Sequence, residues 1–384
     1  MNKQKKVLLY LGKFPGYGFD IDGGSIMARQ LIDTLKHHCC LDVVFIRKNQ
    51  ETFEDDSVNS VCYVDYLDPW NNKFIRRMEN LDTNALAMKN YSDYDVIIAA
   101  HISKFFGLNR IDSSFWSKTV LFPMFCSSSY IRAGEVVPQE YINEENIVVK
   151  KVRKIITPSA DEKKDLITDY ECVSDKIKVI YRGITPLIKY KTRESTSEIL
   201  KIICIGTLKL QKNSKETLNL LELLDKTGLM SELHLVCTIQ DQNYYEDFLR
   251  MIDERNYTNR IHFHISIKQS ELAKLIDTMD LNISMSKWET FGRGIFEGAS
   301  AGLPTFVFDD LLTVKDLCDM NYGIRFCKNT NDMASKIINC IHNKDEYKLM
   351  SASLESISKK FSYYTEQELL RHEILNIEEE YCAK

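Results

Sequence analysis

The sequence predicts an α/β protein with two doubly wound, Rossmann-like domains. Short apolar runs of strand length alternate with helical patterns along the chain, which is typical of parallel sheets that helices cover on both faces. A length of 384 residues is sufficient for two domains, each with its own core. Residues 185–198 are polar and charged, so we expect a linker there, between domains at residues 1–184 and 199–361.

The composition is that of an ordinary globular protein. Hydrophobic residues make up 44% of the chain and charged residues 27%, and the formal net charge of -5 argues against a nucleic-acid-binding protein. The eleven cysteines have no C-x-x-C spacing, which indicates reduced thiols and neither a disulfide framework nor a structural metal site. Apolar runs are shorter than a membrane span or a signal-peptide core, so we expect a cytoplasmic protein.

The first domain is expected to begin with a strand at residues 6–12 and a helix that ends near residue 38. Gly23 and Gly24 precede this helix, and paired glycines allow a ligand to approach the backbone closely. Their spacing differs from the G-x-G-x-x-G motif of dinucleotide-binding proteins, which argues against a nucleotide-cofactor dehydrogenase. Further strands of this domain are expected at residues 41–46, 61–64, 96–99, 119–122, 154–157 and 178–180.

Three groups of polar residues in the first domain are candidates for ligand contacts. His101 follows an expected strand, at the carboxyl edge of the sheet where ligands of such folds bind. Asp20 and Asp22 have the spacing of a D-x-D metal motif, but they precede a helix and do not end a buried strand, so we assign no metal to them. The basic clusters at residues 76–77 and 150–154 are interpreted as solvated helix faces, with membrane contact as the alternative.

The second domain is expected to begin with a strand at residues 200–205, a loop at residues 206–213 and an amphipathic helix. A later strand at residues 261–267 contains His262 and His264, which share one face because side chains alternate along a strand. Two histidines without a third ligand do not indicate a metal site, so we predict none there.

The most informative stretch of the second domain is residues 281–310, where a strand, a polar loop, a helix and another strand follow one another. The helix is expected to begin at about Phe291. Glu289 in the loop and Glu297 in the helix lie on either side of Gly292. The free N–H groups of a helix N-terminus stabilise an anion such as a diphosphate, and nearby carboxylates suit the hydroxyl groups of a sugar or ribose.

The residues of this stretch, SKWETFGRGIFEGASAGLPTFVF, resemble the E-x7-E signature of retaining GT-B glycosyltransferases of family 4. The family pattern is S-x-x-E-x-F-G-x-x-x-x-E-x-x-x-x-G-x-P. The residues that match it at the right spacing are Ser286, Glu289, Phe291, Gly292, Glu297, Gly302 and Pro304. The resemblance implies the GT-B architecture, in which the two domains face a cleft and a final helix, here about residues 362–384, packs back on the first domain.

The resemblance also implies roles for single residues. Lys212 matches the lysine that contacts the donor diphosphate. Thr207 occupies the position of the usual family arginine, and Lys209 is the candidate to replace it. Glu297 would hold the ribose hydroxyl groups, and Glu289 would orient the transferred sugar. The catalytic residues are then Glu289, Lys212 and His101, and the remaining donor-binding residues are Gly23, Gly24, Ser266, Thr290, Phe291, Gly292 and Arg293.

The implied reaction transfers a hexosyl group, with retention, from a UDP- or GDP-linked sugar to a hydroxyl group of a glycan or lipid-linked acceptor. No metal or cofactor takes part, and the setting is bacterial-type surface polysaccharide assembly, with peripheral membrane contact through the first domain. A second histidine that is common in the family is missing, since Phe122 to Phe125 stand in that region. This departure and Thr207 leave open a non-catalytic, glycosyltransferase-like subunit that binds carbohydrate or stabilises an active partner.

Overall fold

The computed structural model describes residues 4–375 with the exception of residues 13, 16–22, 48–51, 67, 69–71, 80–89, 109–110, 125, 133 and 319. Asp20 and Asp22 therefore lie outside the described residues, as do residues 376–384 of the expected last helix. Contacts between Cα atoms divide the chain into two compact units. Unit 1 contains the described residues up to 181 together with residues 366–375, and unit 2 contains residues 182–365.

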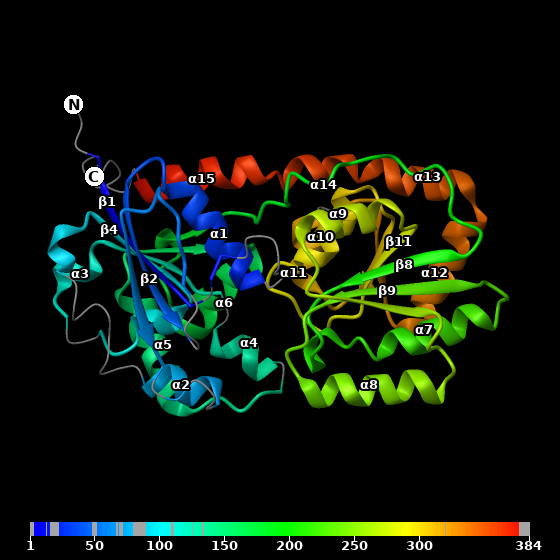
Figure 1. Ribbon diagram of the computed structural model, residues 1–384, viewed down its shortest axis with the longest axis horizontal. Coiled ribbons are helices and arrows are strands. Elements are labelled where there is room, and N and C mark those ends of the chain that lie inside the picture. The colour runs from blue at the N-terminus through cyan, green and yellow to red at the C-terminus, as the bar shows by residue number, and fades with distance from the viewer. Residues whose placement is uncertain are drawn as a thin grey trace. The chain divides into compact units, whose positions relative to one another are not determined.

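Unit 1 is built on a sheet of seven parallel strands (Figure 1). The strands are β1 (Lys6–Leu11), β2 (Cys40–Arg47), β3 (Ser60–Asp65), β4 (Val96–Ala100), β5 (Thr119–Phe122), β6 (Lys154–Thr157) and β7 (Ile177–Val179). Their order in the sheet is β3-β2-β1-β4-β5-β6-β7, so the strand order reverses between β1 and β4. The carboxyl ends of two such strands form the switch point at which doubly wound sheets bind ligands.

Helices pack on both faces of the unit 1 sheet in two apolar clusters. The helices are α1 (Gly23–Leu35), α2 (Lys73–Glu79), α3 (Ser113–Trp116), α4 (Ser127–Arg132), α5 (Gln139–Lys151), α6 (Ala160–Tyr170) and α15 (Tyr363–Leu375), with short 3-10 helices η2 (Tyr91–Asp93), η3 (Ile102–Phe105) and η5 (Ser174–Lys176). One cluster contains Leu31 of α1 with Leu370 and Ile374 of α15, and the other contains Val148 of α5 and Leu166 of α6. Residues 366–375 of the last helix thus belong to the core of unit 1.

Unit 2 is built on a sheet of six parallel strands in the order β10-β9-β8-β11-β12-β13 (Figure 1). The strands are β8 (Leu200–Ile205), β9 (Ser231–Cys237), β10 (Ile261–Ile265), β11 (Leu281–Ser284), β12 (Thr305–Phe308) and β13 (Ile324–Cys327). The helices are η6 (Leu210–Lys212), α7 (Glu216–Asp225), α8 (Gln242–Glu254), α9 (Gln269–Asp277), α10 (Arg293–Ser300), α11 (Leu312–Cys318), α12 (Thr330–His342), α13 (Lys344–Ser353) and α14 (Glu355–Lys360). Two parallel sheets with interleaved helices confirm the predicted α/β fold class.

The segment at residues 185–198, which we expected to be a linker, packs on unit 2. Arg193 is 8% exposed, and its guanidinium donates hydrogen bonds to the main-chain oxygens of Asp277 (2.9 Å) and Ile276 (3.3 Å) at the end of α9. Carbonyl groups at a helix C-terminus lack partners within the helix, so a cation there is favourable. The polar composition of this segment therefore reflects contacts with unit 2, and the division by contacts falls before it.

The basic clusters of unit 1 are more buried than solvated helix faces. Arg77 donates hydrogen bonds to the hydroxyl oxygens of Tyr141 (3.1 Å) and Tyr130 (3.3 Å). Lys154 is 9% exposed, and its Nζ atom lies 2.8 Å from Oε2 of Glu373 on α15. Our interpretation as solvated faces is therefore wrong for Arg77 and Lys154. Burial of these cations is tolerated because hydroxyl oxygens and a carboxylate compensate for the lost water.

The described part of the chain has ten cysteines, all of them free thiols and most of them buried. None of the helices in these same residues combines the length and the apolar character that crossing a membrane requires.

Candidate active site

Hydrogen bonds hold together two loops at the carboxyl edge of the unit 2 sheet. One loop follows β8, and the other follows β11. The side-chain amide of Gln211 donates to the main-chain oxygen of Trp288 (2.9 Å), and the main-chain N–H of Lys287 donates to the oxygen of Gln211 (2.9 Å). Lys212 and Glu289 are the next residues in their loops, so these two bonds place their side chains together.

Lys212 and Glu289 form an ion pair in which Nζ lies 2.5 Å from Oε1. Their side chains are 19% and 9% exposed, so solvent screens the pair less than it would screen a surface pair. A small cavity beside Lys212 has a mainly apolar lining, to which Lys212 and the hydroxyl groups of Ser214, Ser284 and Ser286 add polar atoms. The structure thus brings two of the predicted catalytic residues together. A diphosphate that binds Lys212 has to share this cation with Glu289.

Helix α10 begins after a left-handed turn at Gly292. The φ angle of this residue is 86°, which residues with a side chain rarely adopt. An added Cβ would also lie 3.1 Å from Cδ1 of Ile295. The expected start of the helix at about Phe291 is wrong by two residues, because the chain enters the helix only after this turn, at Arg293. The N–H groups of Phe291 and Gly292 therefore belong to the turn, and in the first helical turn the N–H group of Ile295 donates to the main-chain oxygen of Gly292 (2.9 Å).

The first turn of α10 lies close against the end of β8. A Cβ at Gly294 would be 2.3 Å from the main-chain oxygen of Ile205, a distance that no side chain can adopt. Glycine at this position therefore permits the close approach of the helix to the strand that leads into the Lys212 loop. Arg293 and Glu297 lie four residues apart in α10, so their side chains share a face of the helix.

Glu297 is a buried carboxylate whose oxygens have no hydrogen-bond donor in the part of the chain that the structure describes. The residue is 2% exposed. Burial raises the pKa of Glu297 to about 7, and the positive charge of Arg293 opposes this shift only in part. Buried polar groups are nearly always hydrogen-bonded. A ligand with hydroxyl groups offers the hydrogen-bond donors that this carboxylate does not find among the described residues.

Two further residues of the predicted site, Arg293 and Phe291, have partners within unit 2. The Nη1 atom of Arg293 donates a hydrogen bond to the main-chain oxygen of Gly183 (3.1 Å). The ring of Phe291 is buried and packs against Phe296 and Phe361, with centroids 5.0 Å and 5.4 Å away. Phe291 thus anchors the turn before α10 in the core, and only its main chain remains for a ligand.

Comparison with known protein families supplies an independent finding for unit 2. Residues 190–355 match the family that is described as "Glycosyl transferases group 1". The matched stretch lies within unit 2. A comparison with curated proteins finds no match.

The chain as a whole is similar to solved structures of GT-B glycosyltransferases. Sucrose-phosphate synthase from Thermosynechococcus elongatus has a TM-score of 0.80 at 12% identity, over 99% of this chain and 100% of that chain. WaaG, a glycosyltransferase involved in lipopolysaccharide biosynthesis, has a TM-score of 0.74 at 13% identity, over 96% and 99%. Anabaena HepE, solved in complex with UDP-glucose, has a TM-score of 0.71 at 16% identity, over 99% and 100%. These likenesses show the GT-B fold, and the group 1 match together with this fold supports a glycosyltransferase.

The other predicted donor-binding residues of unit 2 lie in loops after its strands. Thr207, in the position of the family arginine, has a buried hydroxyl without a hydrogen-bond partner in the described residues. Lys209 precedes η6 with an extended backbone. Ser266 is exposed with φ of 52°, and its N–H donates to the oxygen of Cys237 (2.8 Å). Thr290 is partly buried in the loop before α10.

The predicted site residues of unit 1 are Gly23, Gly24 and His101. The two glycines are the first residues of α1. His101 follows β4 with φ of 100°, and its Nδ1 atom accepts a hydrogen bond from the N–H of Ser103 (3.2 Å). Its Nε2 atom is buried and has no hydrogen-bond partner in the described residues. Burial, and then nearby cations such as Arg77, hold the pKa of His101 well below its usual range, so the ring is neutral at pH 7.

Sequence reasoning missed Gln211, which ties the two site loops of unit 2 together. A glutamine before Lys212 has no distinctive spacing, and its partners lie more than 70 residues away in the chain. Only the register of β8 against β11 brings these loops side by side.

Proposed function

We propose that the protein is a retaining, hexosyltransferase-type enzyme that transfers a sugar from a nucleoside-diphosphate sugar to an acceptor hydroxyl group. The observation that carries this proposal is the buried carboxylate of Glu297, which has no hydrogen-bond partner among the described residues. Glu297 lies in α10, and the N-terminus of this helix follows Glu289, which pairs with Lys212. A ribose diol donates hydrogen bonds to such a carboxylate. A diphosphate accepts hydrogen bonds from a helix N-terminus and from a lysine.

In the proposed reaction, the bond between the anomeric carbon of the sugar and the diphosphate oxygen breaks, and the electron pair stays on that oxygen. The acceptor hydroxyl oxygen forms the new bond on the same face of the sugar, and its proton passes to the diphosphate. Lys212 and the N–H groups at the start of α10 stabilise the charge that develops on the leaving group. Glu289 orients the sugar, and Glu297 holds the ribose.

UDP-linked sugars are the first donors to test, because HepE was solved in complex with UDP-glucose, and GDP-linked sugars are the second. We propose a glycan or lipid-linked acceptor and a role in surface polysaccharide assembly, on the cytoplasmic side of a membrane. The involvement of the structurally similar WaaG in lipopolysaccharide biosynthesis supports this class of acceptor.

A panel of nucleotide sugars is expected to identify the donor. We expect one donor to raise the melting temperature of the protein and to be hydrolysed slowly to the free sugar and nucleoside diphosphate, because Lys212 and Glu297 complement both halves of the nucleotide. Differential scanning fluorimetry and a nucleotide-release assay measure the two effects. If no common donor raises the melting temperature and none is hydrolysed, the proposal that the protein is an enzyme is contradicted.

Such a negative result would favour a second candidate function, a glycosyltransferase-like subunit that binds carbohydrate or stabilises an active partner without catalysis. Thr207 in place of the family arginine is the specific observation in its favour, because it removes one cation from the diphosphate region. Thr207→Arg then provides a direct test, since a gain of hydrolysis would show that the rest of the site is competent.

Turnover is expected to survive excess EDTA. In the proposed site, Lys212 and the N-terminus of α10 meet the charge of the diphosphate, which in other glycosyltransferases is the task of a divalent ion. The measurement is nucleotide release at 25 °C with and without EDTA, on protein whose folding is checked by circular dichroism. Complete loss of turnover that manganese or magnesium restores would contradict metal independence and would direct attention to Asp20 and Asp22.

A further inference from the structure

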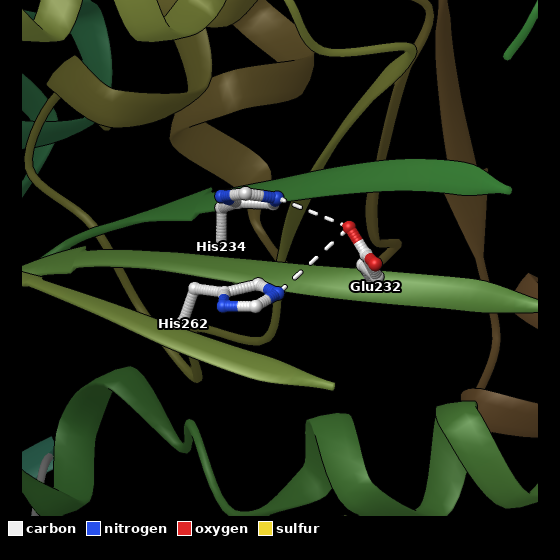
Figure 2. A group of neighbouring side chains, drawn as sticks. All are labelled: Glu232, His234 and His262. Atoms are coloured by element: carbon white, nitrogen blue, oxygen red, sulfur yellow. Dashed lines mark ion pairs between the residues drawn. The ribbon is translucent and has the colours of Figure 1, made fainter. Parts of the chain in front are cut away.

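Three side chains on one face of the unit 2 sheet point toward a common position. Glu232 and His234 lie two residues apart in β9 and therefore project from the same face. His262 lies in β10 directly opposite His234 in the parallel register. Figure 2 shows both imidazole rings turned toward the carboxylate of Glu232. The Oε2 atom of Glu232 is 3.9 Å from Nε2 of His234 and 3.8 Å from Nε2 of His262.

One ring nitrogen of His234 has a hydrogen-bond partner among the described residues and the other has none, as is common for a histidine that binds a metal. Its Nδ1 atom lies 3.0 Å from Nε2 of His264, the next histidine on β10. Its Nε2 atom is buried and has no hydrogen-bond partner in the described residues, since the carboxylate of Glu232 is too far away for a hydrogen bond. Either nitrogen of this contact can be the donor; in the tautomer in which His234 donates from Nδ1, the lone pair of its Nε2 atom is directed at the common position, as in metal-binding histidines.

An ordinary ion pair does not account for this cluster. The Oε2 atom of Glu232 lies 3.9 Å and 3.8 Å from the two Nε2 atoms, and both separations exceed the length of a hydrogen bond. Lys201 on β8 is the register partner of Glu232, but no ion pair between the two is found among the described residues. The carboxylate and the imidazole nitrogens are thus close together without a bond that explains their orientation.

We propose that Glu232, His234 and His262 bind a divalent transition-metal ion of the zinc class, and that His264 orients His234. The three ligand atoms lie within 4.8 Å of one another. Tetrahedral coordination at about 2.0–2.1 Å requires separations of roughly 3.4 Å, which small side-chain rotations provide. Two imidazole nitrogens and one carboxylate suit zinc and its neighbours in the first transition row, whereas magnesium and calcium prefer oxygen ligands alone. His262 is 40% exposed, so a water molecule has access to a fourth position.

The place of this site in the sheet indicates its role. Glu232 and His262 are the second residues of β9 and β10, so they lie toward the amino ends of the strands, whereas the Lys212 loop leaves the carboxyl end of β8. β10 is the edge strand of the unit 2 sheet. An ion that joins His262 to Glu232 and His234 fastens this edge strand to its neighbour. The ion therefore stabilises the folded domain and takes no part in sugar transfer.

The test is calorimetric titration of the full chain, without an affinity tag, with zinc chloride at pH 7.5. We expect one zinc ion per chain and a rise in melting temperature. His262→Gln and Glu232→Gln are each expected to weaken zinc binding by at least about tenfold, and His264→Gln by a smaller factor, as for residues that orient a ligand. Cobalt substitution gives a second measurement, because the absorption of bound cobalt reports its coordination by nitrogen and oxygen ligands.

The adjacent and exposed His37 and His38 of unit 1 provide a matched control, since they form another pair of histidines on the surface. Their double replacement with glutamine is expected to leave zinc binding unchanged. The proposal is overturned if the wild-type protein binds no zinc, if binding persists in both Glu232→Gln and His262→Gln, or if the control variant abolishes it. Circular dichroism and the melting temperature without metal show whether each variant is folded, and the nucleotide panel is independent of all these outcomes.

Discussion

Glu297→Gln is expected to stabilise the ligand-free protein at pH 8 while it weakens nucleotide binding. The pKa of Glu297 rises from 4.5 to about 7 on folding, so the folded state binds the proton more tightly than the unfolded state does. The stability of the wild type therefore falls as pH rises through this interval, by at most about 3 kcal/mol. Glutamine has nearly the same shape without the charge, so urea unfolding should show a stability gain at pH 8 that is absent at pH 5.

The same substitution is expected to reduce the affinity for UDP. Hydrogen bonds from ribose hydroxyl groups to a charged carboxylate are about twice as strong as those to an amide, so we expect a loss of roughly 1–2 kcal/mol at pH 8. The affinity of the wild type should also fall as pH drops below about 7 and Glu297 becomes protonated, and the variant should lack this part of the pH dependence. Titration calorimetry at pH 6 and pH 8 measures both effects. A variant that is less stable at every pH and binds UDP normally would show that Glu297 has a structural role.

Glu289→Gln is expected to lower turnover by about a hundredfold without weakening UDP binding. Glu289 is proposed to act on the transferred sugar, and loss of an interaction that is specific to the transition state affects turnover more than affinity. The ion pair also bears on the affinity for UDP, since Lys212 pairs with Glu289 in the ligand-free site. Without the carboxylate, Lys212 is available to the diphosphate alone, so UDP should bind as tightly as before or more tightly.

Single-turnover kinetics with the identified donor and calorimetry with UDP separate these two effects. Lys212→Met is the matched control, because it removes the other half of the same pair and is expected to reduce both turnover and UDP affinity. If Glu289→Gln weakens UDP as much as Glu297→Gln does, the two carboxylates do not divide the sugar and the ribose between them. The assigned roles would then be wrong, although the fold would be unaffected.

The order of strands and helices could be predicted from the sequence because each central strand is a continuous apolar run. All residues of β4, for example, are buried, and its run of apolar residues predicts a strand without any knowledge of the neighbouring strands. We expected the polar segment at residues 185–198 to be a solvent-exposed linker. Its charged residues instead include Arg193, which donates hydrogen bonds to the end of α9. Composition cannot distinguish a solvated charge from one that caps a helix.

Within the site, the spacing of Glu289, Gly292 and Glu297 identified one loop and one helix, but it could not show which side chains are already paired. The Lys212–Glu289 ion pair and the absence of a partner for Glu297 in the described residues depend on distances between loops that are far apart in the chain. The cluster at Glu232 was missed for the same reason. His262 and His264 lacked a third ligand in their own strand, and the parallel register of β9 provides it.

The two hydrogen bonds of Gln211 make the loop after β8 and the loop after β11 a single mechanical unit. For the glycosyltransferase that we propose, donor preference is therefore expected to depend on both loops together. Exchange of the loop after β11 alone is expected to give Gln211 a main chain of another shape, and exchange of the loop after β8 alone removes Gln211 together with Lys212. Chimeras that exchange both loops together keep the hydrogen bonds between them, so both loops are the appropriate segment to exchange when the proposed donor specificity is tested.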